Sequence, residues 1–561
     1  MFIEIFPRRA ISFENPLVVT RKPDGRIMAY ISNHSSSDGL YPLAGHDAEH
    51  GVRWWISGHC FAWKTFEKVS PADCIKGANA DPRKILEKFW GSYFVVMYDG
   101  ASGRFTVLRG PCADREIYYI VAADGGCIIG DCPEEIFRAI ARKPAPDLSY
   151  LRKFLQDESP QLGETAWQDL RILPPCMYLE IQNGRGISLH DVQLLSADSP
   201  PAQGMDGLID VISAAVRASL ATRQCRAVLF LSGGLDSTLL AVALRHAERQ
   251  DSVEALTFVD NSRAPGDEVE MARAVARACG MRHHSYDLNT CLPFAPARAA
   301  PFCASPGGDL CFLGHFESLQ RSGFGGPSVT KLSGHGGDAI FMEPPPMAAP
   351  LDAMSRGRMI RASSAVVDLA ILYRVPLWRI FSKVISEIKA LQANARRFGW
   401  PLAFQPARRQ QLANLAATYR ELGCAVRANG GGLLYPLLAG PVVRVALASR
   451  PEDFFSRHFA RTPIRIAVDR ELNLPSVWRR DKGDTTHWTL RGICVHARSI
   501  RERCLDGYCV REGLVDPQKA EASIRRTALG RADLLRAVVN LYAVETMLRG
   551  RERFEQGRHV A

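Results

Sequence analysis

One segment constrains the fold of this chain more than any other: residues 227–244 read AVLFLSGGLDSTLLAVAL. Five apolar residues, Ala227 to Leu231, lead into a loop with two adjacent glycines, and an amphipathic pattern follows. A short apolar run of this kind is typical of a buried strand, and the later spacing is typical of a helix. The segment therefore predicts a strand–loop–helix unit, the repeating element of a parallel sheet covered by helices.

The loop itself has the composition of an anion-binding site. Gly233 and Gly234 allow a tight turn that brings backbone N–H groups close to an anion, and a helix starting near Ser237 adds its positive dipole end. Ser232 and Ser237 can donate hydroxyl groups to phosphate oxygens, and Asp236 can hold a magnesium ion that bridges them. No lysine follows the second glycine, so the loop is not a Walker loop. We therefore predict a phosphate-binding site, and the SGGLDS sequence resembles the loop of the ATP pyrophosphatase group, which implies ATP as the ligand.

The surrounding sequence continues the same alternation. Helical patterns cover residues 205–220, 237–249 and 267–279, and strand patterns cover residues 227–231, 253–259, 284–288 and a run that ends at Leu332. This order predicts a doubly wound parallel sheet, and helical patterns dominate from about residue 354. Upstream, WGSYFVVMYDGASGRFTVLRG predicts a β-hairpin, followed by strands over 116–122 and 127–130 and a helix over 133–141.

The chain divides into two predicted domains. Its 561 residues exceed what one hydrophobic core usually organises. The segment SADSPPAQG lacks apolar periodicity and contains two prolines, as linkers do. We predict an α/β two-domain protein with a β-rich domain over residues 1–195, a linker over 196–205 and a parallel-sheet domain over 206–561.

Composition excludes several classes of protein. Hydrophobic residues make up 47% and charged residues 23%, as in globular proteins. No signal peptide and no uninterrupted apolar run of membrane-spanning length is present, so we expect a cytoplasmic protein without membrane insertion. The 15 cysteines include no CxxC pair, which favours reduced thiols.

The net charge of +11 is spread over 70 dispersed lysines and arginines outside any nucleic-acid module, so we expect no nucleic-acid partner. A minority interpretation gathers seven basic residues around a polyphosphate or an acidic peptide: Arg479, Arg480, Lys482, Arg491, Arg498, Arg501 and Arg503.

A second strand-to-loop junction, VTKLSGHGGDAIF, lies about 100 residues after the first. The carboxyl ends of neighbouring parallel strands share one crevice, so Asp338 can complete a Mg²⁺ site with Asp236. Between two glycines of this loop stands His335, whose side chain can take a proton from an attacking amine. The alternative is that His335 only hydrogen-bonds the loop or the substrate.

Together the two loops resemble those of asparagine synthetase and β-lactam synthetase, and Ser333, Gly334, Gly337 and Asp338 match the second loop. Asparagine synthetases carry glutamate and β-lactam synthetase carries tyrosine where this chain has His335. The GHGGD sequence is similar to that of lasso-peptide macrolactam synthetases. The resemblance implies an ATP-pyrophosphatase-type domain in which Leu231 and Phe258 contact adenine.

The resemblance extends to both ends of the chain. YPLLAGPVVRVALASRPEDFF and RTPIRIAVDRELNLPSVWRRDKG resemble the synthetase stretch that ends in a catalytic lysine near the pyrophosphate, here Lys482. GSYFVVMYDGASGRFTVLRGPCADREIYY and LRILPPCMYLEI resemble the glutaminase half of asparagine synthetase, which implies an Ntn-hydrolase-like first domain. Phe2 occupies the position of that family's nucleophilic cysteine, and the nearest cysteine is Cys60. We therefore expect a degenerate domain that hydrolyses no glutamine.

These observations lead to one main functional hypothesis. The chain is predicted to be a lasso-peptide cyclase that adenylates an Asp or Glu side chain of a precursor peptide. It then joins this carboxylate to the N-terminal amine, releasing AMP and pyrophosphate, with a leader-binding protein and a leader protease as pathway partners. The alternatives are a β-lactam-type synthetase, an ammonia-using asparagine synthetase, and a catalytically silent peptide-binding scaffold.

Overall fold

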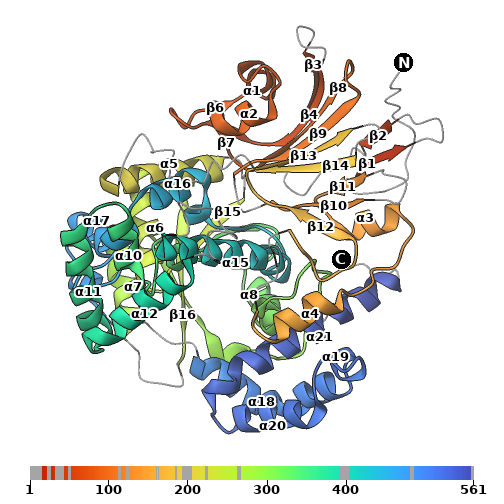
Figure 1. The fold of residues 1–561 in the computed structure, drawn as a ribbon. Coiled ribbons are helices and arrows are strands. Elements are labelled where there is room, and N and C mark those ends of the chain that lie inside the picture. Colours follow the sequence, from red (N-terminus) through yellow and green to blue (C-terminus); the bar gives the residue numbers. More distant parts are fainter. Residues whose placement is uncertain are drawn as a thin grey trace.

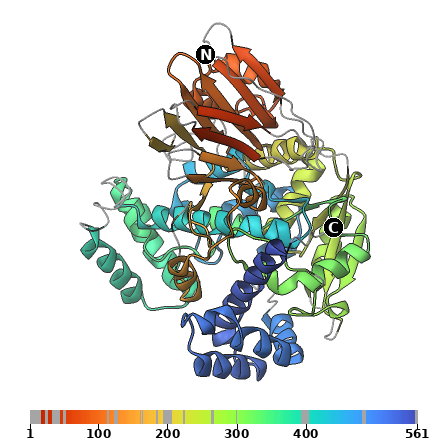
Figure 2. The ribbon, with the colours of Figure 1, turned by 90° about the vertical axis from the view of Figure 1, so that its right-hand side faces the viewer.

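The two predicted regions form two differently built domains in the computed structural model (Figures 1 and 2). The structure describes residues 16–21, 27–31, 43–47, 52–111, 115–121, 127–158, 161, 163–182, 186–191, 205–221, 225–261, 267–297, 299–391, 393, 404–480 and 486–556. No helix within these ranges has the length and apolarity needed to cross a membrane. The predicted linker, residues 196–205, lies outside the described residues except for Met205.

The first domain contains antiparallel sheets. A five-stranded sheet has the order β12-β10-β11-β1-β2, with β1 Pro16–Arg21, β2 Ile27–Ile31, β10 Ile117–Val121, β11 Cys127–Gly130 and β12 Leu170–Leu173. A six-stranded sheet has the order β14-β13-β9-β8-β4-β3, with β3 Leu43–Asp47, β4 Val52–Gly58, β8 Tyr93–Asp99, β9 Arg104–Arg109, β13 Met177–Gln182 and β14 Gly186–Asp191. A small sheet, β6-β5-β7, is formed by Cys60–Ala62 (β5), Lys68–Val69 (β6) and Phe89–Trp90 (β7).

The helices of this domain are α1 Pro71–Gly77, α2 Pro82–Lys88, α3 Pro133–Ala139 and α4 Leu148–Leu155. The predicted hairpin is confirmed as β8 and β9, and β11 has the predicted bounds. The predicted helix over 133–141 ends at Ala139, because Ala141 has a φ of 51° that an α-helix cannot contain. Buried side chains from both large sheets, such as Val107 and Ile129, form one apolar layer between them.

The second domain is built on a parallel sheet with the order β17-β16-β15-β18-β19. Its strands are β15 Arg226–Phe230, β16 Val253–Val259, β17 His283–Asp287, β18 Val329–Leu332 and β19 Leu433–Leu434. The strand order grows outward from β15 first to one side and then to the other, so the crevice between β15 and β18 is a topological switch point. The predicted fold class is confirmed; β19, which contributes only two residues, was not predicted.

Helices surround this sheet, and the last third of the chain is helical, as expected (Figure 1). They are η1 Met205–Gly207, α5 Leu208–Ala221, α6 Leu235–His246, α7 Asp267–Ala278, η2 Leu288–Thr290, η3 Gly308–Phe312, α8 Leu313–Arg321, α9 Gly337–Ile340, α10 Ala349–Ser355, α11 Met359–Tyr373, α12 Leu377–Lys389, α15 Pro406–Ala428, η4 Pro436–Leu438, α16 Gly440–Ala448, η5 Pro451–Asp453, α17 Thr462–Leu472, η6 Pro475–Trp478, α18 Thr486–Leu505, α19 Tyr508–Arg511, α20 Pro517–Ala528, η7 Ala532–Leu534 and α21 Leu535–Glu555.

The first domain packs directly on α15 of the second. Glu116 lies against Gly423, where any side chain would collide with its carboxylate. Four residues later Arg427 forms an ion pair with Glu134 at 2.9 Å. Trp167, fully buried, donates its indole N–H to the carbonyl of Cys303 at 2.8 Å. The β-rich domain therefore helps to hold α15 in place.

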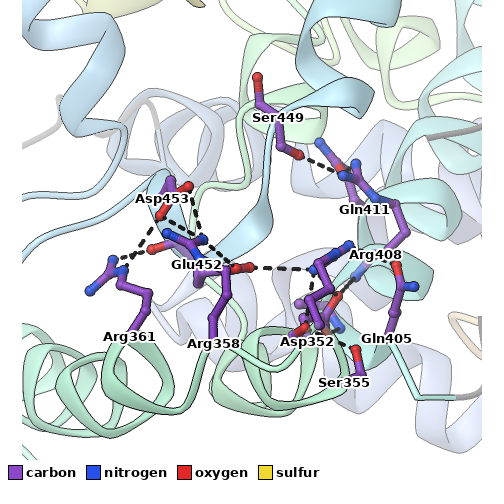
Figure 3. Close-up of polar contacts among 12 residues, drawn as sticks. Asp352, Ser355, Arg358, Arg361, Gln405, Arg408, Gln411, Ser449, Glu452 and Asp453 are labelled. Atoms are coloured by element: carbon purple, nitrogen blue, oxygen red, sulfur yellow. Dashed lines mark hydrogen bonds and ion pairs between the residues drawn. The ribbon is translucent and has the colours of Figure 1, made fainter. Parts of the chain in front are cut away.

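A buried ionic network joins α10, α11, α15 and η5 (Figure 3). Asp352 is fully buried and accepts hydrogen bonds from the backbone N–H groups of Ala407 and Arg408. Burial raises the pKa of Asp352 to about 7, and these N–H groups oppose the shift. Glu452, also fully buried, pairs with Arg358 at 2.8 Å. Because buried charges need such partners, the network fixes how these elements pack.

Candidate active site

The first loop folds as a closed hydrogen-bonded turn at the carboxyl end of β15. The backbone N–H of Ser232 donates to the hydroxyl of Ser237 at 3.2 Å, and the two hydroxyl oxygens lie 3.1 Å apart. Gly233 has a φ of 75° and packs so closely on α7 that a Cβ would approach the carbonyl of Glu268 within 2.8 Å. The α6 helix begins at Leu235, two residues before the predicted start, so its N-terminus faces the loop.

The second loop interlocks with the first. A Cβ on Gly334 would lie 3.0 Å from the backbone of Ser237, and one on Gly337 would collide with the carboxylate of Asp236. Gly336 has a φ of 93°, which favours glycine, and it caps α9. The glycines of this loop are therefore required for its close approach to Asp236.

Asp236 and Asp338, the predicted ligands of Mg²⁺, both pair with the guanidinium of Arg461. Nη1 of Arg461 lies 2.8 Å from both carboxylate oxygens of Asp236 and 3.0 Å from Oδ1 of Asp338. Nε of the same guanidinium lies 3.2 Å from Glu343. Burial disfavours the charge on Arg461, yet the carboxylates of Asp236, Asp338 and Glu343 outweigh it and raise the pKa of the guanidinium.

This arrangement tests whether the two aspartates fit a metal ion. One nitrogen already lies within ion-pair distance of three of their oxygens, so the two carboxylates can converge on a single positive charge. Among the described residues no three His, Cys, Asp or Glu side chains form a complete metal site. Two carboxylates supplemented by phosphate oxygens and water are the ligand set that Mg²⁺ commonly takes. The residues fit magnesium together with a polyphosphate.

A cavity of about 640 Å³, here called the phosphate cavity, opens over both loops. It is lined by the two aspartates and by basic side chains from the C-terminal helical region, Arg374, Arg461, Arg465, Arg479 and Arg480. The combination of loop N–H groups, a helix N-terminus and arginines is suited to a triphosphate.

A second cavity of about 530 Å³, the aromatic cavity, adjoins the first. Both are lined by Phe230, Ser232, Glu268, Ser333 and His335. Leu231 and Phe258, the predicted adenine contacts, lie in its wall, and the ring of Phe258 lies 5.5 Å from that of His315. Burial lowers the pKa of His315 to about 4, so this ring is neutral at pH 7. An apolar, aromatic wall of this kind accommodates a purine ring or an apolar side chain.

Four carboxylates line the aromatic cavity, and two of them, Asp309 on η3 and Glu421 on α15, lie apart from the SGGLDS loop; the others are Asp260 and Glu268. Burial raises the pKa of Asp309 to about 6, and the nearby charge of Glu421 raises it further. The pKa of Glu421 is also raised by burial, although Arg536 and Arg420 oppose the shift. Such a pair favours a cationic ligand or accepts a proton.

His335 stands at the junction of the two cavities. Its backbone N–H donates to the hydroxyl of Ser333 at 3.2 Å, and its ring lies 5.8 Å from that of Tyr435. Because His335 and Ser333 line both cavities, a group transferred from one cavity to the other passes this side chain. The position suits a proton acceptor.

The structure brings together all predicted site residues that it describes: Leu231, Ser232, Gly233, Gly234, Asp236, Ser237, Phe258, Ser333, Gly334, His335 and Asp338. Lys482 lies outside the described residues. Of the seven basic residues in the minority interpretation, Arg479 and Arg480 line the phosphate cavity, whereas Arg498 and Arg501 pair with Glu502 and Glu521 at the surface.

Sequence reasoning missed Arg461, Asp309 and Glu421. Arg461 precedes α17 with a φ of 53°, which turns the chain toward the loops, and no local pattern marks it. Asp309 and Glu421 are more than 100 residues apart, and single carboxylates carry no signal of pairing. In the first domain, Cys60 is buried beside Cys74, and burial raises the pKa of its thiol well above the usual value. Such a thiol is unsuited to nucleophilic attack.

Comparisons with known proteins bear on the second domain. The asparagine synthase family matches residues 207–549. No curated protein matches the chain. Two solved structures show a distant likeness, glutamine phosphoribosylpyrophosphate amidotransferase from B. subtilis complexed with ADP and GMP and an allosteric regulatory enzyme of purine biosynthesis. Their identities are 10% and 9%, they cover 50% and 51% of this chain and 76% of each of those chains, and both TM-scores are 0.20. Because the family match spans more than half of the sequence, the chain belongs to the asparagine synthase family of ATP-dependent, amide-forming ligases.

Proposed function

We propose that this chain is a peptide cyclase. It activates an Asp or Glu side chain of a precursor peptide with ATP and joins that side chain to the peptide's N-terminal amine, releasing AMP and pyrophosphate. The observation that carries the proposal is the carboxylate pair Asp309 and Glu421, which lines the aromatic cavity together with His335 and whose pKa values are raised by burial.

The first half of the reaction belongs to the phosphate cavity. Ser232, Ser237 and the N-terminus of α6 bind the triphosphate, while the arginines at the opposite wall face its leaving end. Asp236 and Asp338 would hold Mg²⁺, which neutralises charge on the phosphates when it is bound. The substrate carboxylate attacks the α-phosphorus, and pyrophosphate leaves. Lys482 is proposed to act on this leaving group.

The second half of the reaction takes place at the junction of the cavities. An N-terminal amine arrives largely as an ammonium, and Asp309 and Glu421 stabilise that charge. The amine must lose a proton before its nitrogen can attack the acyl carbon and displace AMP. His335 and the carboxylate pair are positioned to accept that proton. Holding both ends of one peptide makes the attack a matter of orientation.

The amine is proposed to be part of the substrate itself, because Phe2 stands where a glutaminase nucleophile would be and no ammonia is generated within the chain. A β-lactam-type synthetase, whose small substrate carries its own amine, is the second candidate. A leader-binding protein and a leader protease are proposed partners because a peptide must reach this site with a free N-terminus.

The proposal is tested by incubating the chain with ATP, Mg²⁺ and peptides that combine a free N-terminus with an internal Asp or Glu. AMP release and the mass loss of one water are recorded separately. An N-acetylated peptide should still give AMP but no cyclic product. His335→Ala should keep AMP release while slowing ring closure by roughly 10²–10⁴-fold, the usual contribution of a positioned base.

The outcomes separate the alternatives. AMP release only with aspartate and ammonium would identify an asparagine synthetase. Lactam formation with small amino acids alone would identify a β-lactam-type enzyme. If none of these carboxylates supports ATP–pyrophosphate exchange, the chain is a catalytically silent scaffold.

A further inference from the structure

The exposed apolar side chains of this protein are concentrated in one place. Of the fifteen large hydrophobic side chains that are exposed in the described residues, ten lie between Met354 and Ile388, on α10, α11 and α12. Folded monomers rarely leave a large contiguous apolar patch in water without using it. The concentration marks an interaction surface that the proposed reaction does not need.

The α12 helix carries the clearest part of this surface. Ile380 and Val384 are buried and attach the helix to its neighbours, while the adjoining stripe is exposed. This stripe consists of Leu377, Trp378, Phe381, Ile385 and Ile388, with exposed fractions of 47%, 67%, 50%, 50% and 42%. At 3.6 residues per turn these five positions fall within an arc of about 100° beside the buried side chains. The apolar face of the helix is therefore wider than the part of it that packs against the rest of the protein.

The polar side of α12 is basic. It contains Arg379, Lys383 and Lys389 together with two serines, Ser382 and Ser386. The single acidic residue of the helix, Glu387, is neutralised within the protein by Arg409 at 2.6 Å and Lys383 at 3.1 Å. At the start of the neighbouring α11, Arg358 and Arg361 form ion pairs with Glu452 and Asp453 in the buried network of Figure 3. The free positive charge of this region thus belongs to α12, beside its apolar stripe.

We propose that α12 docks this protein on an anionic lipid surface. A helix with Trp, Phe and aliphatic side chains on one face and Lys or Arg on the other lies in the interface plane of a bilayer. Lipid phosphates meet every cation along the helix, whereas a protein groove would need a carboxylate placed for each one. The helix lies at the periphery of the second domain in both views, where a flat surface can reach it (Figures 1 and 2). With 13 residues, α12 is too short to span a membrane, so the association is peripheral.

The test measures co-sedimentation of the full-length chain with vesicles of phosphatidylcholine alone and of phosphatidylcholine mixed with phosphatidylglycerol. We expect binding to the mixed vesicles that weakens with salt, and little binding to the neutral ones. Trp378→Glu with Phe381→Glu should lower the partition coefficient at least about tenfold, since two stripe residues then oppose insertion. Leu529→Glu is the control, because Leu529, directly after α20, is 81% exposed and its replacement should leave vesicle binding unchanged.

A second variant distinguishes loss of membrane binding from misfolding of the first variant. Arg379→Ser with Lys389→Ser keeps the apolar stripe and the Lys383–Glu387 ion pair, and it should reduce both binding to anionic vesicles and its salt dependence. Absence of binding by the unmodified chain, equal binding to neutral vesicles, or equal loss in Leu529→Glu would each overturn the proposal. A dimer that dissociates in the Trp378→Glu, Phe381→Glu variant while no vesicles are bound would assign the surface to a second copy.

Discussion

Two pairs of carboxylates, one in each of the adjoining cavities, differ in the groups that surround them. Asp236 and Asp338 converge on the buried guanidinium of Arg461. Asp309 and Glu421 line the aromatic cavity, where burial and mutual repulsion raise the pKa of Asp309 to about 6. Both pairs stand beside the same loop, so their different surroundings set their chemistry.

This difference assigns the two half-reactions to the two pairs. A pair that already converges on a positive charge is preorganised for another cation, such as magnesium with its phosphates. A pair with a raised pKa holds or accepts a proton near neutral pH. Carboxylates are thus proposed to bind metal in the phosphate cavity and to transfer protons in the aromatic cavity.

The largest effect is expected at the first pair. Replacing both Asp236 and Asp338 by asparagine should lower AMP formation by roughly 10⁴-fold or more, because each carboxylate contributes several kcal/mol through the metal. The measurement is ATP–pyrophosphate exchange at saturating Mg²⁺. Thermal unfolding serves as the control for folding, and a folded double variant with full exchange would remove the two-carboxylate site.

A selective loss is expected at the second pair. Glu421→Gln should leave ATP–pyrophosphate exchange within a few-fold while slowing amide formation by roughly 10²–10³-fold, since a neutral amide accepts no proton. Asp309→Asn is the matched variant in the same cavity. Single-turnover mass spectrometry on the peptide would separate the steps, and parallel loss of exchange would tie Glu421 to ATP instead.

The pairs should also differ in their response to pH. Amide formation should rise as the pH increases through about 6, where Asp309 loses its proton. The rate of AMP formation should not change in this pH range, because the raised pKa of Arg461 keeps its guanidinium charged. Stability should change with pH in the opposite direction. Because the pKa of Asp309 is raised in the folded protein, its contribution to the free energy of unfolding is complete below about pH 4 and is lost as the pH rises through about 6. Rate profiles of the two half-reactions and urea unfolding across this range test both statements.

The smallest effect on catalysis is expected from the buried network of Figure 3, which lies outside both cavities. Glu452→Gln should destabilise the protein by about 1.5–3 kcal/mol because the buried carboxylate loses its charged hydrogen bonds to Arg356 and Arg358, while residual folded enzyme keeps its ratio of amide formation to AMP formation. Glu502→Gln, which breaks a surface pair with Arg498 at 2.9 Å, should change stability by less than about 1 kcal/mol. A changed product ratio in Glu452→Gln would show that the network acts on the site.

The sequence by itself determined the parts of this protein that are local. The SGGLDS and SGHGGD loops follow apolar strands, and their glycines and aspartates have consequences that do not depend on the rest of the chain. The hairpin of β8 and β9 and the strand β16 follow in the same way from alternation and turn residues. Neighbouring parallel strands put both loops at one edge, so the meeting of Asp236 with Asp338 could also be predicted.

Only the tertiary structure decided which distant residues join these loops. Arg461 reaches the aspartates because the chain enters α17 in a left-handed turn, and Asp309 meets Glu421 because α15 is held between η3 and the first domain. The apolar residues of α12 have the spacing of a core-facing stripe in the sequence, and packing alone decided that five of the seven stay exposed. Periodicity fixes which side chains share a face of an element, whereas long-range packing selects what that face contacts.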